Sequence, residues 1–144
     1  MAGSVDPTRG QFDAFKALPR ATPIQMLNLI RLKAVADYPP DHPRHGQGLT
    51  GLEAYRAYGR ATALFLRRLG ARQIWAGRPQ TVVTGPEGEQ WDLAFIIEYP
   101  TAGAFLAMVT DPDYREAVRH RTAAVADSRL IRLAPLDPGE GLGE

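Results

Sequence analysis

Apolar residues recur every three or four positions between Leu52 and Leu69, the spacing that places side chains on one face of a helix. Charged residues take the opposite face, and the segment is followed by Gly70, a residue type that favours helix ends. The pattern predicts an amphipathic helix from residue 52 to residue 69. Its apolar face would be formed by Leu52, Tyr55, Tyr58, Thr62, Phe65, Leu66 and Leu69.

Three shorter helices are predicted from residues that favour helix starts. Asp6 would cap a short N-terminal helix, with Pro7 at its first position, and this helix would end near Pro19. Thr101 and Asp111 would cap two helices that follow one another in the C-terminal half of the chain.

Four segments have the composition of strands and are bounded by glycine or proline. The second and third flank the turn sequence PEGE, so they are predicted to pair as an antiparallel hairpin whose long first arm is broken at Gly77 and Pro79. Residues 37–51 are rich in proline and glycine, which indicates a surface loop. The four predicted strands cover residues 24–33, 71–85, 91–100 and 128–135.

The order of the predicted elements, after one extra helix, is strand, helix, strand, strand, helix, strand. Two strand-helix-strand units joined by a hairpin predict an α+β fold of the ferredoxin-like split type, with an antiparallel sheet and its helices on one face. The other face would be bare. We expect a second copy of the chain to cover it, giving a dimeric α+β barrel, because apolar strand residues cannot all face helices or water. These residues are Met26, Ile30, Leu93, Phe95 and Ile97.

The sequence resembles the domain-of-unknown-function 1330 family, which belongs to the dimeric α+β barrel superfamily. The resemblance lies in the stretches LEAYRAYGRATALFLRRLGARQIWAG and WDLAFIIEYPTAGAFLAMVTDPDYREAVRHRTAAVADSRLIRL, above all in EYPT, DPDY and ADSRLIRL. It extends over about residues 24–135 and implies the fold, whereas none of its motifs is a catalytic signature. We therefore expect an N-terminal helical extension over residues 1–22, one ferredoxin-like barrel domain over residues 23–136 and a flexible tail over residues 137–144.

Composition excludes several classes of protein. The formal charge is +1 and there is no block of lysine or arginine, so we expect no nucleic-acid partner. Cysteine is absent, which removes disulfides, thiol catalysis and zinc-cysteine sites. We see no secretory signal and no apolar run that could span a bilayer, so we expect a cytoplasmic protein that does not bind membranes.

Four residues are predicted to bind a ligand. Asn28 interrupts an apolar strand and shares a face with Met26 and Ile30; if the leucines on either side of Asn28 face the helices, Asn28 faces the barrel interior. A buried amide needs a partner, which is either a ligand or a fixed bond within the protein. Tyr58 lies on the apolar stripe of the helix, where core packing is the simpler explanation, but a phenol at the border of the stripe could also reach a cleft. An aromatic wall would be formed by Trp75 and Trp91 on the hairpin arms, unless these residues serve the core or the subunit interface.

Two residues could move a proton. Asp92 stands beside Trp91, and enclosure in a pocket would raise its pKa and make it a candidate base. His120 lies among charged residues on a predicted helix, where it serves either proton transfer or a solvated surface. A metal set built from Asp41, His42 and His45 is a minor alternative, because these residues lack rigid helical spacing.

The sequence therefore predicts a homodimer that binds a small hydrophobic or aromatic metabolite in an interior cleft, with or without cofactor-independent chemistry. Heme or flavin is suggested only by analogy with the superfamily, so we expect no cofactor. The alternative is a non-catalytic binding or assembly module whose barrel interior is simply packed.

Overall fold

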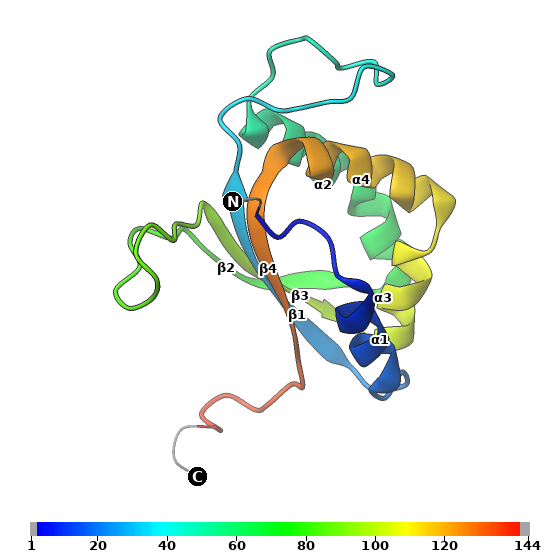
Figure 1. Cartoon of the computed structure of the whole chain (residues 1–144). Helices are drawn as coiled ribbons and strands as arrows, with labels where there is room; N and C mark the ends of the chain where they lie inside the picture. Colours follow the sequence, from blue (N-terminus) through cyan, green and yellow to red (C-terminus); the bar gives the residue numbers. More distant parts are fainter. Residues whose placement is uncertain (1–2, 142–144) are drawn as a thin grey trace.

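The computed structural model describes residues 3–141, so residues 1–2 of the expected extension and residues 142–144 of the expected tail lie outside it. Four strands form one sheet in the order β2-β3-β1-β4, and every neighbouring pair is antiparallel. This is the predicted ferredoxin-like arrangement, and Figure 1 shows the helices on one side of the sheet. The elements are α1 (Arg9–Ala17), β1 (Ile24–Leu32), α2 (Gly51–Leu69), β2 (Arg72–Gly77), β3 (Leu93–Tyr99), α3 (Ala102–Val109), α4 (Pro112–Ala124) and β4 (Val125–Leu133).

The long helix ends, and the two C-terminal helices begin, where the sequence predicts. Gly70 ends α2 in the left-handed conformation, with φ of 73°. The side chain of Thr101 accepts a hydrogen bond from the N–H of Ala104 at the start of α3, and Asp111 accepts from the first turn of α4. These ends are set by local chemistry, which is why the pattern located them.

The predicted start of α1 is wrong by two residues. Thr8, not Asp6, is the N-cap, because its hydroxyl accepts from the N–H of Gln11 while the Gln11 side chain accepts from the N–H of Thr8. This reciprocal capping box satisfies two backbone donors at once, whereas Asp6 and Pro7 remain in the segment before the helix.

The strand bounds also differ from the predicted ones. β4 begins at Val125, directly after α4, because the chain turns there into pairing with the end of β1. The hairpin arms are shorter than predicted: β2 ends at Gly77, and residues 78–92 form a long loop before β3. Trp91 and Asp92 therefore precede β3 instead of lying within it.

The prediction of which strand residues form the bare face is wrong. Met26 pairs with Ile97 and Ile30 pairs with Leu93, so all four side chains share a face. That face is the one covered by helices, where Met26 is 3% and Ile30 0% exposed. Sequence alternation gave the correct grouping but not the side, because the residues in between are equally apolar.

The uncovered face of the sheet carries its own apolar row. Leu27 pairs with Ile96 on one side and Ile131 on the other, and Trp75 of β2 pairs with Ile96. Trp75 is 50% and Ile131 46% exposed, a level that large apolar side chains in contiguous rows rarely have without a partner. We call the row Leu27, Leu29, Trp75, Ile96 and Ile131 the open face.

Candidate functional site

The core between the sheet and the helices is divided into two apolar clusters. One is built around Ile24, Met26 and Tyr99, and the other around Ile30 and Val125. Asn28 lies on β1 between Met26 and Ile30 and points to the same face, so it stands at the boundary of the two clusters. The expectation that Asn28 faces the barrel interior is therefore wrong, since the leucines beside it take the open face.

Four further polar side chains reach this boundary from the helices. Tyr55 and Tyr58 of α2 pack against the two different clusters, with their ring centroids 5.5 Å apart. Tyr114 of α4 meets Tyr58 through a short hydrogen bond of 2.6 Å between the two hydroxyl oxygens. Arg121 follows seven residues later on the same helix, which places it on the same face as Tyr114. We call Asn28, Tyr55, Tyr58, Tyr114 and Arg121 the polar layer.

The phenols of the polar layer are neutral at physiological pH. Burial raises the pKa of Tyr55, Tyr58 and Tyr114 above the ordinary value of 10.0, and for Tyr55 and Tyr114 the neighbouring phenol Tyr58 raises it further. The charge of Arg121 acts in the opposite direction on all three. These tyrosines can therefore donate or accept hydrogen bonds but cannot serve as bases.

Only the NH₂ group of the Asn28 side-chain amide has a hydrogen-bond partner among residues 3–141. Its Nδ2 donates to the carbonyl of Met26 at 3.1 Å, and its Oδ1 has no hydrogen-bond partner among residues 3–141. Within that part of the chain no fully enclosed side-chain oxygen or nitrogen lacks a partner, so Oδ1 must be reached by solvent. One acceptor in the middle of the core is thus available to water or a ligand.

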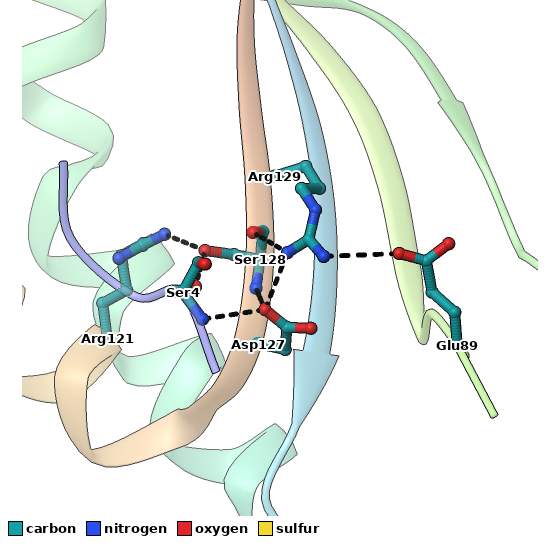
Figure 2. A network of polar contacts seen from close by, with 6 residues as sticks. All are labelled: Ser4, Glu89, Arg121, Asp127, Ser128 and Arg129. Atoms are coloured by element: carbon teal, nitrogen blue, oxygen red, sulfur yellow. Dashed lines mark hydrogen bonds and ion pairs between the residues drawn. The ribbon is translucent and has the colours of Figure 1, made fainter. Parts of the chain in front are cut away.

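Arg121 is the cation of the polar layer, and its partners are neutral; Figure 2 shows its contact with Ser128. Its Nη1 donates to the carbonyl of Val5 at 2.6 Å and its Nη2 to the hydroxyl of Ser128 at 3.3 Å, while that hydroxyl donates to the carbonyl of Ser4. Among residues 3–141, Arg121 forms no ion pair.

The nearby carboxylates in Figure 2 form ion pairs with another arginine, Arg129. Arg129 contacts Asp127 at 2.8 Å and Glu89 at 3.3 Å. Burial acts to raise the pKa of Asp127, but the hydrogen bonds from the Ser4 N–H and from Arg129 outweigh it and hold that pKa below its ordinary value. The negative charges of this network are balanced on the Arg129 side, which leaves the charge of Arg121 uncompensated.

Beside the polar layer, one residue of β4 is exposed to solvent. Leu130 pairs with Asn28 and therefore points to the same face, yet it is 46% exposed. On one side, Ser128 is covered by the N-terminal segment; on the other, Arg132 is held by the carbonyls of Phe15 and Pro19. We call this uncovered stretch around Leu130 the β4 edge.

The structure separates the other three predicted ligand residues from one another. Tyr58 joins Asn28 in the polar layer, whereas Trp75 lies on the open face. Trp91 packs against the guanidinium of Arg129, 5.1 Å from its ring centroid, and also lies outside the layer. Asp92 is exposed and holds strands together: its N–H donates to the carbonyl of Ile30, and its Oδ2 accepts from a backbone N–H of β1.

His120 lies outside the polar layer, where α4 meets the loop after β1. Its Nδ1 lies 2.6 Å from the hydroxyl of Tyr38, and the ring of His42 stacks on Tyr38 at 4.5 Å. These two histidines form one end of a groove of about 350 Å³ between α2 and α4. We call it the histidine groove; its other main lining residues are Phe65, Asp113, Glu116 and Ala117.

Sequence reasoning missed Tyr114 and Arg121, although their spacing on one helix face was a usable signal. It also missed Tyr38, which lies in a proline-rich loop and has no periodic pattern around it. Within residues 3–141, no group of three or more histidine and carboxylate side chains is arranged to hold a metal ion. In the same part of the chain, every helix is too short or too polar to cross a bilayer.

Comparison with known proteins shows similarity to uncharacterised relatives. A family described as a domain of unknown function (DUF1330) matches residues 48–133. The crystal structure of methylated RPA0582 protein is 50% identical, covers 97% of this chain and 100% of its own, and superposes with a TM-score of 0.88. A second structure, of the RPA0582 protein of unknown function from Rhodopseudomonas palustris, is 50% identical with a TM-score of 0.85 and covers 94% and 99%. No curated protein matches the chain.

Proposed function

The chain belongs to the DUF1330 family, whose description names no activity, and we propose from its own residues that it is a homodimeric small-molecule-binding protein. The ligand would be an aromatic or otherwise hydrophobic molecule with one acidic oxygen group, such as a carboxylate. It would reach the polar layer through the β4 edge. The observation that carries this proposal is Arg121, a partly buried cation with neutral partners, beside the buried phenol of Tyr114 and the partly buried phenols of Tyr55 and Tyr58.

The guanidinium of Arg121 supports an anionic head group on the ligand. A charged group removed from bulk water is costly unless it is paired, and carbonyl or hydroxyl oxygens balance its charge only in part. A carboxylate would form charge-assisted hydrogen bonds there, each contributing roughly 1.5–3 kcal/mol. Tyr55 supports the same head group, because its neutral hydroxyl has no partner among residues 3–141 and can donate.

The surroundings of the layer support a hydrophobic body on the ligand. Apolar clusters lie on both sides, one around Met26 and one around Ile30, and such walls with a few polar groups are typical of small-molecule sites. The free Oδ1 of Asn28 would accept a hydrogen bond from a hydroxyl or amide group of the ligand.

The geometry favours binding over catalysis in this layer. The tyrosines are held neutral by burial, Arg121 is a permanent cation, and the two candidate proton carriers, Asp92 and His120, lie elsewhere. We therefore propose no proton-transfer step here. Dimerisation would take place through the open face, whose apolar row also supports the alternative, an assembly module in which the dimer itself is the product.

A thermal-shift panel tests the proposal. We expect phenylacetate and 4-hydroxybenzoate to raise the melting temperature of the wild-type chain, whereas their neutral amides raise it less. At a ligand concentration of about one hundred times Kd the stabilisation is about 2.7 kcal/mol, which corresponds to a shift of about 5–10 °C for a domain of this size. The Arg121→Met variant should lose the difference between acid and amide, while Arg68→Met, an exposed arginine on α2, should keep it.

The Asn28→Leu variant separates binding from assembly. Loss of one local hydrogen bond is offset by apolar burial, so we expect an unchanged or higher melting temperature, an intact dimer and weaker ligand binding. A panel in which no acid shifts the melting temperature would remove the binding proposal. Because Asn28 lies on the helix-covered face, away from the open face, a dimer that stays intact while no acid binds would favour the assembly module instead.

A further inference from the structure

The histidine groove is walled by a loop that is fixed to the helices. The loop after β1 is held at its base by two backbone hydrogen bonds, from Ala36 to Leu49 at 2.8 Å and from Asp37 to Ala123 at 2.9 Å. Further along, Asp41 forms an ion pair of 2.8 Å with Arg119 of α4. The end wall of the groove is thus positioned by several independent contacts.

His42 lines this groove and carries a hydrogen-bond donor. Its side chain is only 8% exposed, and its Nδ1 accepts the backbone N–H of Arg44 at 3.1 Å. Burial lowers its pKa, and the nearby Arg119 lowers it further, so the ring is neutral at pH 7 and its proton is on Nε2. This Nε2 has no partner among residues 3–141 and is not fully enclosed, and His42 is one of the residues that line the groove. An Nε2 that carries a proton donates to oxygen and does not ligate a metal.

Two carboxylates also line the groove. Asp113 and Glu116 reach it from α4, and Glu116 lies close enough to His42 and His120 to act on the pKa of both, in the raising direction. Neither lysine nor arginine is among the lining residues. Glu116 forms an ion pair of 3.1 Å with Arg119, whereas Asp113 forms no ion pair among residues 3–141. Phe65 and Ala117 form an apolar wall.

We propose that the histidine groove is a second binding site, for a small aromatic amine that also carries a hydroxyl or carbonyl oxygen. The oxygen would accept the hydrogen bond from His42, the ring would pack on Phe65, and the ammonium group would lie near Asp113 and Glu116. This ligand class has the opposite charge to the one proposed for the polar layer. The two sites also use different residues, so each proposal can be tested and rejected independently of the other.

Three probes of similar size test the assignment on the full chain. Tyramine has both the amine and the oxygen, phenethylamine lacks the oxygen, and 3-(4-hydroxyphenyl)propionate replaces the amine by a carboxylate. The chain has three histidines, so their imidazole proton NMR signals can be followed one by one. We expect tyramine to shift the signals of His42 and His120 saturably. It should bind about fivefold or more tightly than phenethylamine, and the propionate should bind more weakly still.

Variants locate the contact. Asp113→Asn should weaken tyramine binding about fivefold or more, while Glu87→Gln, which removes an exposed carboxylate from the loop between β2 and β3, should leave it unchanged. Arg121→Met should also leave it unchanged, which separates this site from the polar layer. The inference is overturned if the propionate binds as tightly as tyramine, if phenethylamine matches tyramine, or if millimolar tyramine moves neither imidazole signal.

Discussion

The hydrogen bond between Tyr58 and Tyr114 gives a sharp test of whether the polar layer contributes to stability in the way its geometry implies. The two hydroxyl oxygens are 2.6 Å apart, and Tyr114 is 7% exposed. Replacing either tyrosine by phenylalanine leaves the other hydroxyl without this partner inside the core. An unpaired buried hydroxyl costs about 1–3 kcal/mol, so each single variant should be destabilised by that amount.

The double variant should be less destabilised than the sum of the two single variants. Removing both hydroxyls leaves no orphaned polar group, and such paired replacements are close to neutral. We therefore expect an interaction energy of about 1–2 kcal/mol in a double-mutant cycle of Tyr58→Phe and Tyr114→Phe. Urea unfolding at pH 7 measures it, and melting temperatures should follow at about 2–4 °C per kcal/mol.

Tyr55 supplies the matched control for this cycle. Its ring packs beside Tyr58, but its hydroxyl has no hydrogen-bond partner among residues 3–141. Tyr55→Phe should therefore change the free energy of unfolding by less than about 0.5 kcal/mol. Additive single variants, or a Tyr55→Phe cost as large as that of Tyr58→Phe, would refute the reasoning.

Three further predictions follow from burial, pairing and packing. Burial lowers the pKa of His42 and His120, so the unfolded chain binds more protons below about pH 6.5; urea titrations should show stability falling there, by up to about 1.4 kcal/mol per pH unit for each histidine, and less in their glutamine variants. Leu27→Lys, at the centre of the open face, should give a folded monomer by light scattering. Gly51→Ala should cost about 1–3 kcal/mol in unfolding free energy, because its Cβ would clash with the carbonyl oxygen of Lys33.

The fold was predictable because the residues that start and end its helices act locally. Gly70 ends α2, and Thr101 and Asp111 begin α3 and α4, through side-chain and backbone contacts made within a few residues of each helix end. The order of elements then leaves few topologies. The start of α1 was missed because Asp6 and Thr8 are both good caps, and only Thr8 has a glutamine three residues later to complete the box.

The side of the sheet that each strand residue faces was not predictable from β1 alone. Asn28 alternates with Leu27 and Leu29, and both sets of positions in this strand are largely apolar. Hydrophobic alternation fixes which residues share a face, but the choice of face depends on which set packs against helices. Here Met26 and Ile30 pack against the helices. Asn28 alternates with the same residues, so it faces the helices as well.

Residues of the candidate sites could be predicted only where the pattern within a single helix or strand indicated them. Tyr58 was found on the helix stripe, whereas its partner Tyr114 comes from a helix that the chain reaches only after two strands. The pairing of Tyr38 with His120 joins residues 82 positions apart, through a loop without periodicity. Contacts of this kind depend on tertiary packing, which local pattern does not encode.

Asn28 explains why the core is divided in two. An amide in the middle of a strand interrupts the apolar packing between Met26 and Ile30, and a leucine there would join the two clusters. The protein satisfies only the NH₂ group of this amide, through the carbonyl of Met26, and leaves its oxygen open. A purely structural amide would be expected to have both halves paired. Together with the uncompensated charge of Arg121, the open oxygen favours a layer that is completed by a bound molecule over one that is merely packed.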